Sequence, residues 1–225
     1  MTSIQEIVDK ALEKKEAHLH SGYISPSSLG QCYRRQFWSR SNEPETNPAD
    51  ERSLRVFKCG YMFEKFVIDC LLILHPEWKT QVKVVQDDIY GYADIVTSDE
   101  VIDTKSQNSR KFWWNIKDMK AGKDIKEMFY NNWLQVMAYA LILGKDRARL
   151  CYISKDDLCI QEYSLPLDDY WKGELAKEYR AIRANWETKV LPPAEPRLYG
   201  GKETKKECGY CPFKDKCFTL EKTNK

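Results

Sequence analysis

Apolar residues recur along the chain at two spacings, one typical of helices and one typical of strands. Helical spacing is found in five segments, which predicts helices over residues 3–20, 25–40, 51–74, 125–143 and 168–189. Shorter runs rich in β-branched residues, bounded by turn residues, predict strands over residues 81–86, 89–97, 100–106, 148–154 and 158–164. Because short turns separate the first three strands, we expect them to form an antiparallel meander.

Residues that start or stop secondary structure support these boundaries. Ser25-Pro26 has the cap-then-proline form of a helix start, and Gly144 suits a left-handed helix end. Pro192-Pro193 ends the last predicted helix, and the polar, proline-broken residues 41–50 are expected to form a loop. The order of helix, three strands, helix, two strands and helix indicates an α/β or α+β core around one mixed β-sheet.

The composition is typical of one globular domain and sets few limits on function. At 225 residues, the chain is long enough for a single well-filled domain. Its 36 Lys and Arg residues nearly balance 34 Asp and Glu residues, so evidence for nucleic-acid binding has to come from local clusters. No apolar run approaches the roughly 20 residues that a membrane span needs, and the N-terminus lacks an export signal. We therefore expect a soluble, cytoplasmic protein.

Two aspartates and a lysine fall on two consecutive predicted strands, in Gly91-Tyr-Ala-Asp-Ile-Val96 and Val101-Ile-Asp-Thr-Lys-Ser106. Because side chains alternate along a strand, Asp103 and Lys105 leave the same face, and Asp94 can face them from the neighbouring strand. A charge among β-branched residues is costly to bury without a partner or a metal ion. Carboxylates bind Mg²⁺ or Mn²⁺, and these ions activate water for phosphodiester hydrolysis. The alternative is that both aspartates are ordinary charges on a half-exposed sheet.

These two motifs resemble those of the PD-(D/E)XK nuclease superfamily, in which two acids and a lysine form the active site. A third motif, Gly60-Tyr-Met-Phe-Glu64, resembles the first motif of the RecB-like branch and adds a carboxylate. The resemblance implies a restriction-endonuclease-like core with a central mixed sheet. It also implies that Lys105 orients the attacking water and that one or two cations are held by Glu64, Asp94, Asp103 and the carbonyl of Thr104.

The last motif of that branch, Gln-x-x-x-Tyr, is matched by Gln135-Val-Met-Ala-Tyr139. Gln135 and Tyr139 are four residues apart and share a helix face. Two roles are open for them: contact with DNA or the lysine, and packing of the helix. One departure from the resemblance is Phe63, since many relatives carry histidine at this position.

Four of the eight cysteines form a set that is split between the two ends of the chain. Cys32 stands alone near the start, and Cys208, Cys211 and Cys217 form a Cys-x2-Cys-x5-Cys motif at the end. Four thiolates bind zinc or an iron–sulfur cluster, and spacing alone leaves both open. Together with the nuclease motifs, this arrangement resembles the RecB-like CRISPR-associated iron–sulfur exonucleases and their viral relatives. The resemblance implies a [4Fe-4S] cluster, although Tyr33 follows Cys32 where that family usually has proline.

The same resemblance implies one nuclease domain over residues 1–225, with a core over about residues 51–190. An iron–sulfur subdomain would join residues 21–40 and 191–225, and its cluster would be mainly structural because it closes a very long loop. The remaining cysteines lie within apolar patterns, where thiols behave as small hydrophobic groups. We therefore expect a plain core role for Cys59, Cys70, Cys151 and Cys159.

A local cluster of basic and aromatic residues follows the third predicted strand. It includes Arg110, Lys111, Trp113, Trp114, Lys117 and Lys120. Cations that contact phosphates and indole rings that stack on bases would suit single strands or frayed ends of DNA. The alternative is a solvated, lysine-rich connection whose tryptophans pack on the core.

Taken together, the motifs predict a metal-dependent DNA exonuclease that carries a [4Fe-4S] cluster. Its substrate would be single-stranded DNA or DNA ends, in recombination, DNA processing or CRISPR-type spacer acquisition. Two alternatives remain: a catalytically weak DNA-binding module and a redox-responsive regulator on the same fold. The sequence leaves open a homo-oligomer or a complex with a recombination or CRISPR protein.

Overall fold

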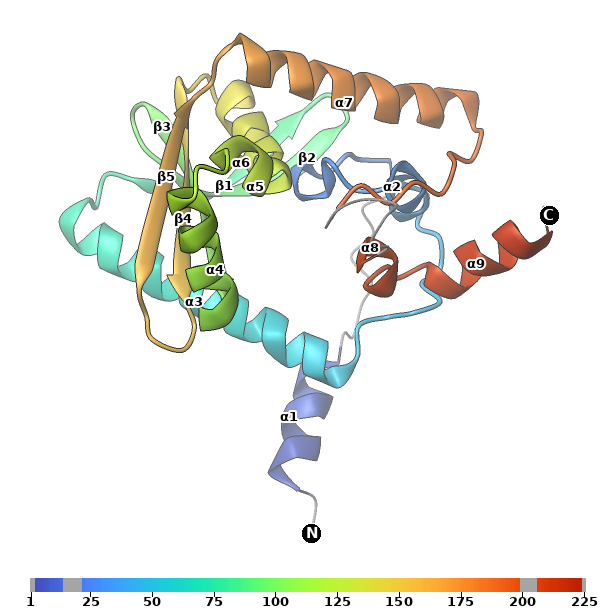
Figure 1. Cartoon of the computed structure of the whole chain (residues 1–225), viewed down its shortest axis with the longest axis horizontal. Helices are drawn as coiled ribbons and strands as arrows, with labels where there is room; N and C mark the ends of the chain where they lie inside the picture. Colours follow the sequence, from blue (N-terminus) through green and yellow to red (C-terminus); the bar gives the residue numbers. More distant parts are fainter. Residues whose placement is uncertain (1–2, 14–21, 199–205, 224–225) are drawn as a thin grey trace. The chain divides into compact units, whose positions relative to one another are not determined.

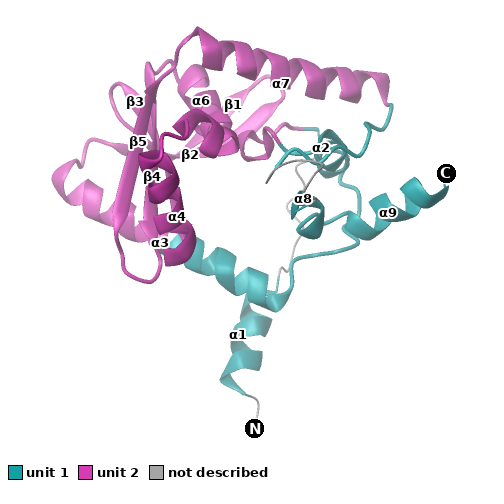
Figure 2. Cartoon of the chain, in the orientation of Figure 1, with its two compact units in different colours: residues 1–22, 31–62, 190–225 teal, residues 23–30, 63–189 magenta. Residues whose placement is uncertain are grey.

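The computed structural model describes residues 3–13, 22–198 and 206–223 (Figure 1). The chain divides into two compact units (Figure 2). We call them the sheet unit, with residues 23–30 and 63–189, and the terminal unit, with residues 1–22, 31–62 and 190–225. The predicted acids and lysine all belong to the sheet unit, and the four cysteines of the split set all belong to the terminal unit.

The sheet unit is built on a five-stranded sheet with the order β1-β2-β3-β4-β5. The pair β3 and β4 is parallel, and the other neighbouring strands are antiparallel. The strands are β1 Lys79–Gln86, β2 Ile89–Val96, β3 Glu100–Gln107, β4 Arg147–Ser154 and β5 Ile160–Pro166. The mixed sheet and the antiparallel meander that the sequence predicts are therefore confirmed.

One face of the sheet is covered by helices that connect the two parallel strands. Parallel neighbours need a crossover, and it contains α4 Ser109–Lys120, α5 Ile125–Met128 and α6 Tyr130–Ile142. Helix α6 contacts β3, β4 and α7 Asp169–Thr188. It is buried on most sides, through Trp133, Leu134, Val136, Met137, Ala138, Tyr139 and Ala140. Such a helix holds its polar side chains in place because its backbone is fixed by packing.

The opposite face packs on the second half of α3, which spans Glu51–Leu74. Val67 and Ile68 of this helix form an apolar cluster with Ile95, Ile102, Cys151 and Ile153. Neighbouring side chains on a strand point to opposite faces. Strand β3 therefore directs Ile102 toward α3 and directs Asp103 toward α6.

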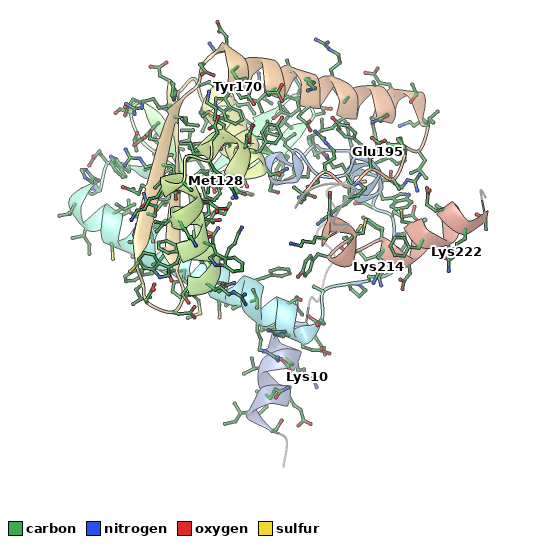
Figure 3. The ribbon with its side chains drawn as sticks, viewed as in Figure 1. Lys10, Met128, Tyr170, Glu195, Lys214 and Lys222 are labelled. Atoms are coloured by element: carbon green, nitrogen blue, oxygen red, sulfur yellow. The ribbon has the colours of Figure 1, made fainter. Side chains whose placement is uncertain are left out.

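The terminal unit contains the first half of α3 together with short helices and connecting segments. The short helices are α1 Ile4–Leu12, α2 Tyr33–Arg40, α8 Lys206–Gly209 and α9 Lys214–Thr223. Figure 3 labels Lys214 and Lys222, which lie near the two ends of α9. Residues from distant parts of the sequence meet here, since the ring centroids of Trp38 and Phe213 lie 5.4 Å apart. Among the described residues, no helix is both long and apolar enough to cross a membrane.

Several predicted helices differ from the observed ones. The helix expected over residues 25–40 is a 3-10 turn, η1 Pro26–Ser28, followed by α2. Gly30 lies between them with a φ of 74°, a left-handed conformation that a right-handed helix cannot contain. The helix expected over residues 125–143 is divided at Phe129 into α5 and α6. The first helix is described only as α1, and residues 14–20 of that prediction lie outside the described residues.

The apolar pattern predicts no helix over α4, whose many lysines are also typical of a connecting segment. Its start nevertheless carries a recognisable signal, since the side chain of Asn108 accepts a hydrogen bond from the amide of Lys111. Gly144 has the expected left-handed conformation, with a φ of 63° after α6. Helix α3 has the predicted bounds.

Candidate active site and cysteine site

The β2–β3 ladder ends where the two candidate aspartates would face each other. Its register pairs are Ile95 with Ile102 and Val96 with Val101, and continuing it would place Asp94 opposite Asp103. Instead, Oδ2 of Asp94 accepts a hydrogen bond of 2.9 Å from the backbone amide of Thr104. The carboxylate thus binds β3 where a ladder hydrogen bond would otherwise form. Asp94 therefore lies beside Asp103, as the sequence predicts.

Asp103 is almost completely enclosed, with 1% of its surface exposed. Nζ of Lys105 donates a hydrogen bond of 2.8 Å to its Oδ1 and lies 2.7 Å from its Oδ2. The same Nζ donates a weaker hydrogen bond of 3.3 Å to Oε1 of Gln135, on α6. Strand alternation thus directs Asp103 and Lys105 to one side, and α6 holds the lysine there through Gln135.

Glu64 approaches this cluster from α3, and Gln81 of β1 holds it. Nε2 of Gln81 donates a hydrogen bond of 2.6 Å to Oε1 of Glu64. Gln81 has a φ of 49°, which is unusual for a residue with a side chain and most unusual within a strand. Strained backbone of this kind persists where surrounding contacts maintain it, and it is concentrated at functional sites.

The three carboxyl groups resist ionisation in this environment. Burial raises the pKa of Asp94 to about 8, and the neighbouring charge of Asp103 raises it further against the opposing effect of Lys105. Burial also raises the pKa of Asp103 and of Glu64. For Lys105, burial opposes the charge, but attraction to Asp103 and Asp94 outweighs it and raises the pKa. The cluster thus holds more acidic groups than its single lysine can keep ionised.

Tyr139 packs against β2, near Asp94 and Asp103. It is 3% exposed, and burial raises the pKa of its hydroxyl well above the usual value. Its hydroxyl oxygen lies so close to Gly91 that a Cβ atom built there would be 2.4 Å from it. The two residues of the Gln-x-x-x-Tyr motif therefore differ: Gln135 contacts Lys105, whereas Tyr139 fixes α6 against β2.

The chemistry of this cluster fits a hard cation, which prefers carboxylate and carbonyl oxygens. Oδ2 of Asp103 is buried and accepts no hydrogen bond from any residue that the structure describes, although the ammonium group of Lys105 is close. Within residues 3–13, 22–198 and 206–223, no three His, Cys, Asp or Glu side chains form a ready-made metal site. A cation held by Glu64, Asp94 and Asp103 would therefore require small movements of these side chains.

The predicted DNA-binding residues lie on α4. Trp113 and Trp114 are 47% and 54% exposed, so these two tryptophans do not pack in the core. The guanidinium of Arg110 lies 4.5 Å from the ring centre of Trp114, and the indole NH of Trp113 donates to Asp157 at 2.8 Å. The remaining predicted cations on this helix are also exposed, namely Lys111, Lys117 and Lys120. Two aromatic rings and four cations are thus displayed on one helix.

The four cysteines of the split set line one pocket in the terminal unit. Cys32 is the N-cap residue of α2, Cys208 lies in α8, and Cys217 lies in α9. Burial raises the pKa of the Cys211 thiol, and Cys32 and Cys217 are close enough to raise it further. The described cysteines are not placed as a ready-made metal site, but four thiols around one pocket fit zinc or an iron–sulfur cluster.

Glu207 joins the two ends of the chain beside this pocket. It is 2% exposed, and its Oε1 accepts a hydrogen bond of 2.7 Å from the amide of Cys32. Its Oε2 accepts hydrogen bonds from the amides of Arg197 and Leu198, at 2.6 and 2.9 Å. A buried carboxylate with three backbone donors is a strong positioning group, because charge-assisted hydrogen bonds are about twice as strong as neutral ones.

The sequence matches no protein-family model and no curated protein. Its structure, however, is similar to the crystal structure of SSO0001, with a TM-score of 0.56 and 18% identity over 94% of this chain and 95% of that chain. It is also similar to the alkaline exonuclease LHK-Exo from Laribacter hongkongensis, with a TM-score of 0.52 and 16% identity over 76% of this chain and 90% of that chain. The chain shares the fold of this exonuclease. At such identities the likeness concerns the fold alone, and it agrees with the predicted α/β core.

Two residues of these sites were missed by sequence reasoning. Gln81 stands in an ordinary strand pattern, where nothing indicates its unusual φ or its bond to Glu64. Glu207 stands in a charged segment directly before Cys208, and only its burial shows its role. The predicted core role of the other cysteines was wrong for Cys59 and Cys70, which are exposed, since both lie on the outer side of α3.

Proposed function

We propose that this protein is a metal-dependent DNA nuclease whose active site is the cluster around Asp94, Asp103 and Lys105. The observation that carries the proposal is the lysine Nζ, which lies between the enclosed carboxylate of Asp103 and the amide oxygen of Gln135. A lysine held beside several acids of raised pKa is an arrangement typical of catalytic sites. The shared fold with an alkaline exonuclease supports the same reading.

The metal ions would be Mg²⁺ or Mn²⁺, held by Glu64, Asp94, Asp103 and the carbonyl of Thr104. When bound, they would activate water and stabilise the charge that develops on the phosphate. The protein's own contribution is positional. Asp94 is fixed by the Thr104 amide, and Glu64 is fixed by Gln81. Lys105 would orient the water and offset negative charge on the phosphate.

We propose DNA ends or single-stranded DNA as the substrate and exonucleolytic cleavage as the mode. The surface of α4 supports this substrate, because its exposed indole rings could stack on unpaired bases while its cations contact phosphates. In the terminal unit, Cys32, Cys208, Cys211 and Cys217 would hold a [4Fe-4S] cluster with a mainly structural role. A function in recombination, DNA processing or CRISPR-type spacer acquisition is the corresponding cellular proposal.

The decisive experiment measures the degradation of end-labelled single-stranded and duplex DNA by anaerobically purified protein. We expect cleavage with Mn²⁺ or Mg²⁺, none with EDTA, and a loss of at least about 100-fold in Asp94→Asn and Lys105→Ala. The matched control is Lys65→Ala, because Lys65 forms an exposed ion pair with Asp69 at 2.7 Å on α3. This control should cleave like the wild type.

The ladder of products would distinguish exonucleolytic from endonucleolytic cleavage. Protein that contains its cluster, binds DNA and shows no cleavage with either metal would overturn the proposal in favour of a DNA-binding module. Equal losses in Lys65→Ala and Lys105→Ala would show that the assay detects general damage to the fold. Iron and sulfide analysis of the same preparation would test the cluster separately from cleavage.

A further inference from the structure

Strand β2 carries two tyrosines, Tyr90 and Tyr92, close to Asp94 along the chain. A Cβ atom built on Gly91 would meet the hydroxyl of Tyr139 on α6, and neighbouring side chains of a strand leave opposite faces, so both tyrosines leave the face away from α6. The pairing of β1 with β2 is continuous from Val82 opposite Ala93 to Gln86 opposite Ile89, whereas the pair that Gln81 and Asp94 would form is missing. Tyr92 therefore lies two residues from the position where the ladder opens at Asp94, and Tyr90 lies two residues from Tyr92.

A third tyrosine extends the row beyond Tyr90. The amide of Ile24 donates to the carbonyl of Asp88 at 2.7 Å, and the amide of Tyr90 donates to the carbonyl of Ile24 at 3.0 Å. These bonds place Tyr23 beside β2, and its ring centroid lies 5.7 Å from that of Tyr90. All of these residues belong to the sheet unit. The row is thus held by backbone hydrogen bonds and not by side-chain contacts alone.

The rings are fixed in position, yet they are open to solvent. Tyr90 and Tyr92 meet edge to face with centroids 5.7 Å apart, and their hydroxyl oxygens are 2.9 Å apart. Tyr23 and Tyr92 are 44% and 45% exposed. A core cluster would bury such rings, because each aromatic side chain gains from burying its large apolar surface. Exposed rings that are already ordered lose little conformational entropy when a flat ligand stacks on them.

A cation accompanies the rings. Nζ of Lys83 lies 5.4 Å from the ring centre of Tyr90, and Lys83 is the register partner of Tyr92. The nearby Asp88 is neutralised by Arg183, whose Nη2 lies 2.7 Å from its Oδ1. The row therefore combines aromatic faces with positive charge. That combination is typical of surfaces that bind the bases and phosphates of unpaired strands.

The spacing of the row favours an extended strand over a duplex. Neighbouring ring centroids of the row lie 5.7 Å apart, well beyond the roughly 3.4 Å between successive bases of one strand in B-DNA. Bases that remain stacked in a duplex cannot each meet a ring at this spacing. We propose that Tyr23, Tyr90, Tyr92 and Lys83 form a stacking platform that binds unpaired nucleotides of a DNA strand beside Asp94. The inference rests on the proposed nuclease function, and it assigns single-stranded DNA to that site.

The test measures binding of the full-length protein to a fluorescent oligothymidylate and to a blunt duplex, both in EDTA so that no cleavage occurs. We expect Tyr92→Ala to weaken binding of the single strand about 10-fold, equivalent to about 1.4 kcal/mol, and to change duplex binding less than about 2-fold. Tyr92→Phe keeps the ring and should bind the single strand like the wild type. Lys83→Gln should weaken binding of the single strand and reduce the salt dependence of that binding.

Tyr170→Ala is the matched control. Tyr170 is 47% exposed at the start of α7 and also has a lysine, Lys126, 4.8 Å from its ring centre (Figure 3). It belongs to the same unit but not to the row, so both DNA affinities should stay unchanged. The melting temperatures of all variants would be compared, so that a variant that fails to fold is recognised. Tyr90→Ala provides a second probe if Tyr92→Ala unfolds.

Single-strand affinity that is unchanged in both Tyr92→Ala and Tyr90→Ala would overturn the platform. Equal losses for single strand and duplex would overturn it as well. These outcomes do not depend on cleavage. If the wild type binds single strands through Tyr92 but never cleaves with Mn²⁺ or Mg²⁺, the nuclease proposal fails and the platform stands. If it cleaves and Tyr92→Ala binds normally, the platform fails alone.

Discussion

The carboxylate of Asp94 accepts a hydrogen bond from the backbone amide of Thr104 at the point where the β2–β3 ladder ends. One acid is thereby fixed against the strand that carries the other acid and the lysine. The backbone of β3 holds Asp94 and, by alternation, aims Asp103 and Lys105 to one side. Two of the three candidate carboxylates are thus positioned by the main chain of β3, Asp94 through a hydrogen bond and Asp103 through its place on the strand.

The first prediction concerns the stability of the metal-free protein against pH. The pKa of Asp94 is raised from 3.8 to about 8, so the folded state disfavours its charged form. Below pH 4 this carboxyl is neutral in both states and costs nothing. Between about pH 4 and pH 8 it ionises in the unfolded chain first, and the stability of the folded protein falls.

Asp94→Asn should therefore be more stable than the wild type near pH 8 and equally stable near pH 4. Urea unfolding in EDTA at a series of pH values would measure this difference. Added Mn²⁺ should stabilise the wild type more than the variant, because a cation favours the charged carboxylate. A wild type that gains stability from pH 4 to pH 8 relative to the variant would contradict the burial of Asp94.

Gln81 provides a second prediction, which separates the effect of its strained backbone on stability from the effect of its side-chain amide on metal binding. Gln81→Gly removes the cost of the positive φ and should stabilise the fold by about 1 kcal/mol. It also removes the hydrogen bond to Glu64, so the Mn²⁺ concentration for half-maximal cleavage should rise several-fold. The matched control is Gln86→Gly, on the same strand. Unfolding curves and Mn²⁺ titrations of cleavage would be compared. If Gln81→Gly is more stable and still reaches half-maximal cleavage at the wild-type Mn²⁺ concentration, Gln81 does not position Glu64.

The predictable parts of this protein are those that depend on local periodicity. Alternation along β3 was enough to place Asp103 and Lys105 on one side, and helical spacing gave α3 its bounds. The contact between Asp94 and Thr104 depends on where two strands separate, which no local pattern encodes. The same holds for Gly30, whose left-handed φ interrupts a helix that cap and proline signals favoured. The sequence could not distinguish Tyr139 from Gln135 either, since their different contacts depend on how α6 is rotated against the sheet.

Gly91 gives a third prediction, since it leaves room for the hydroxyl of Tyr139. A Cβ atom at this position would lie 2.4 Å from that oxygen, so Gly91→Ala should destabilise the protein by about 1–3 kcal/mol. Removing the hydroxyl in Gly91→Ala/Tyr139→Phe should restore part of this loss. Gly173→Ala is the control, because no atom lies within 4 Å of its added Cβ and α7 should gain about 0.5–1 kcal/mol. Chemical unfolding of the wild type, Gly91→Ala, Tyr139→Phe and the double variant would measure the coupling, and strictly additive effects would contradict the contact.

Glu207 gives a fourth prediction, for the terminal unit. Glu207→Gln leaves one oxygen for three backbone amides, so at least one buried donor loses its partner, at a cost of about 1–3 kcal/mol. Because Cys32 is among these donors, the variant should also retain less bound iron or zinc. The comparison is with Glu187→Gln, an exposed glutamate on α7. Metal analysis and unfolding curves that leave Glu207→Gln indistinguishable from the control would contradict its positioning role.

The cysteines outside the split set give the last prediction, because their environments differ within one unit. Cys151 is 4% exposed in the apolar cluster under α3, and burial raises the pKa of its thiol to about 12. Cys70 lies on the exposed side of α3. Since the thiolate is the reactive form, iodoacetamide at mildly alkaline pH should label Cys151 at least about 100-fold more slowly than Cys70. Mass spectrometry after timed labelling would measure both rates, with Cys70→Ser to confirm the assignment. Denaturant should make the two rates similar, and fast labelling of Cys151 in the folded protein would show that the apolar cluster opens or is not formed.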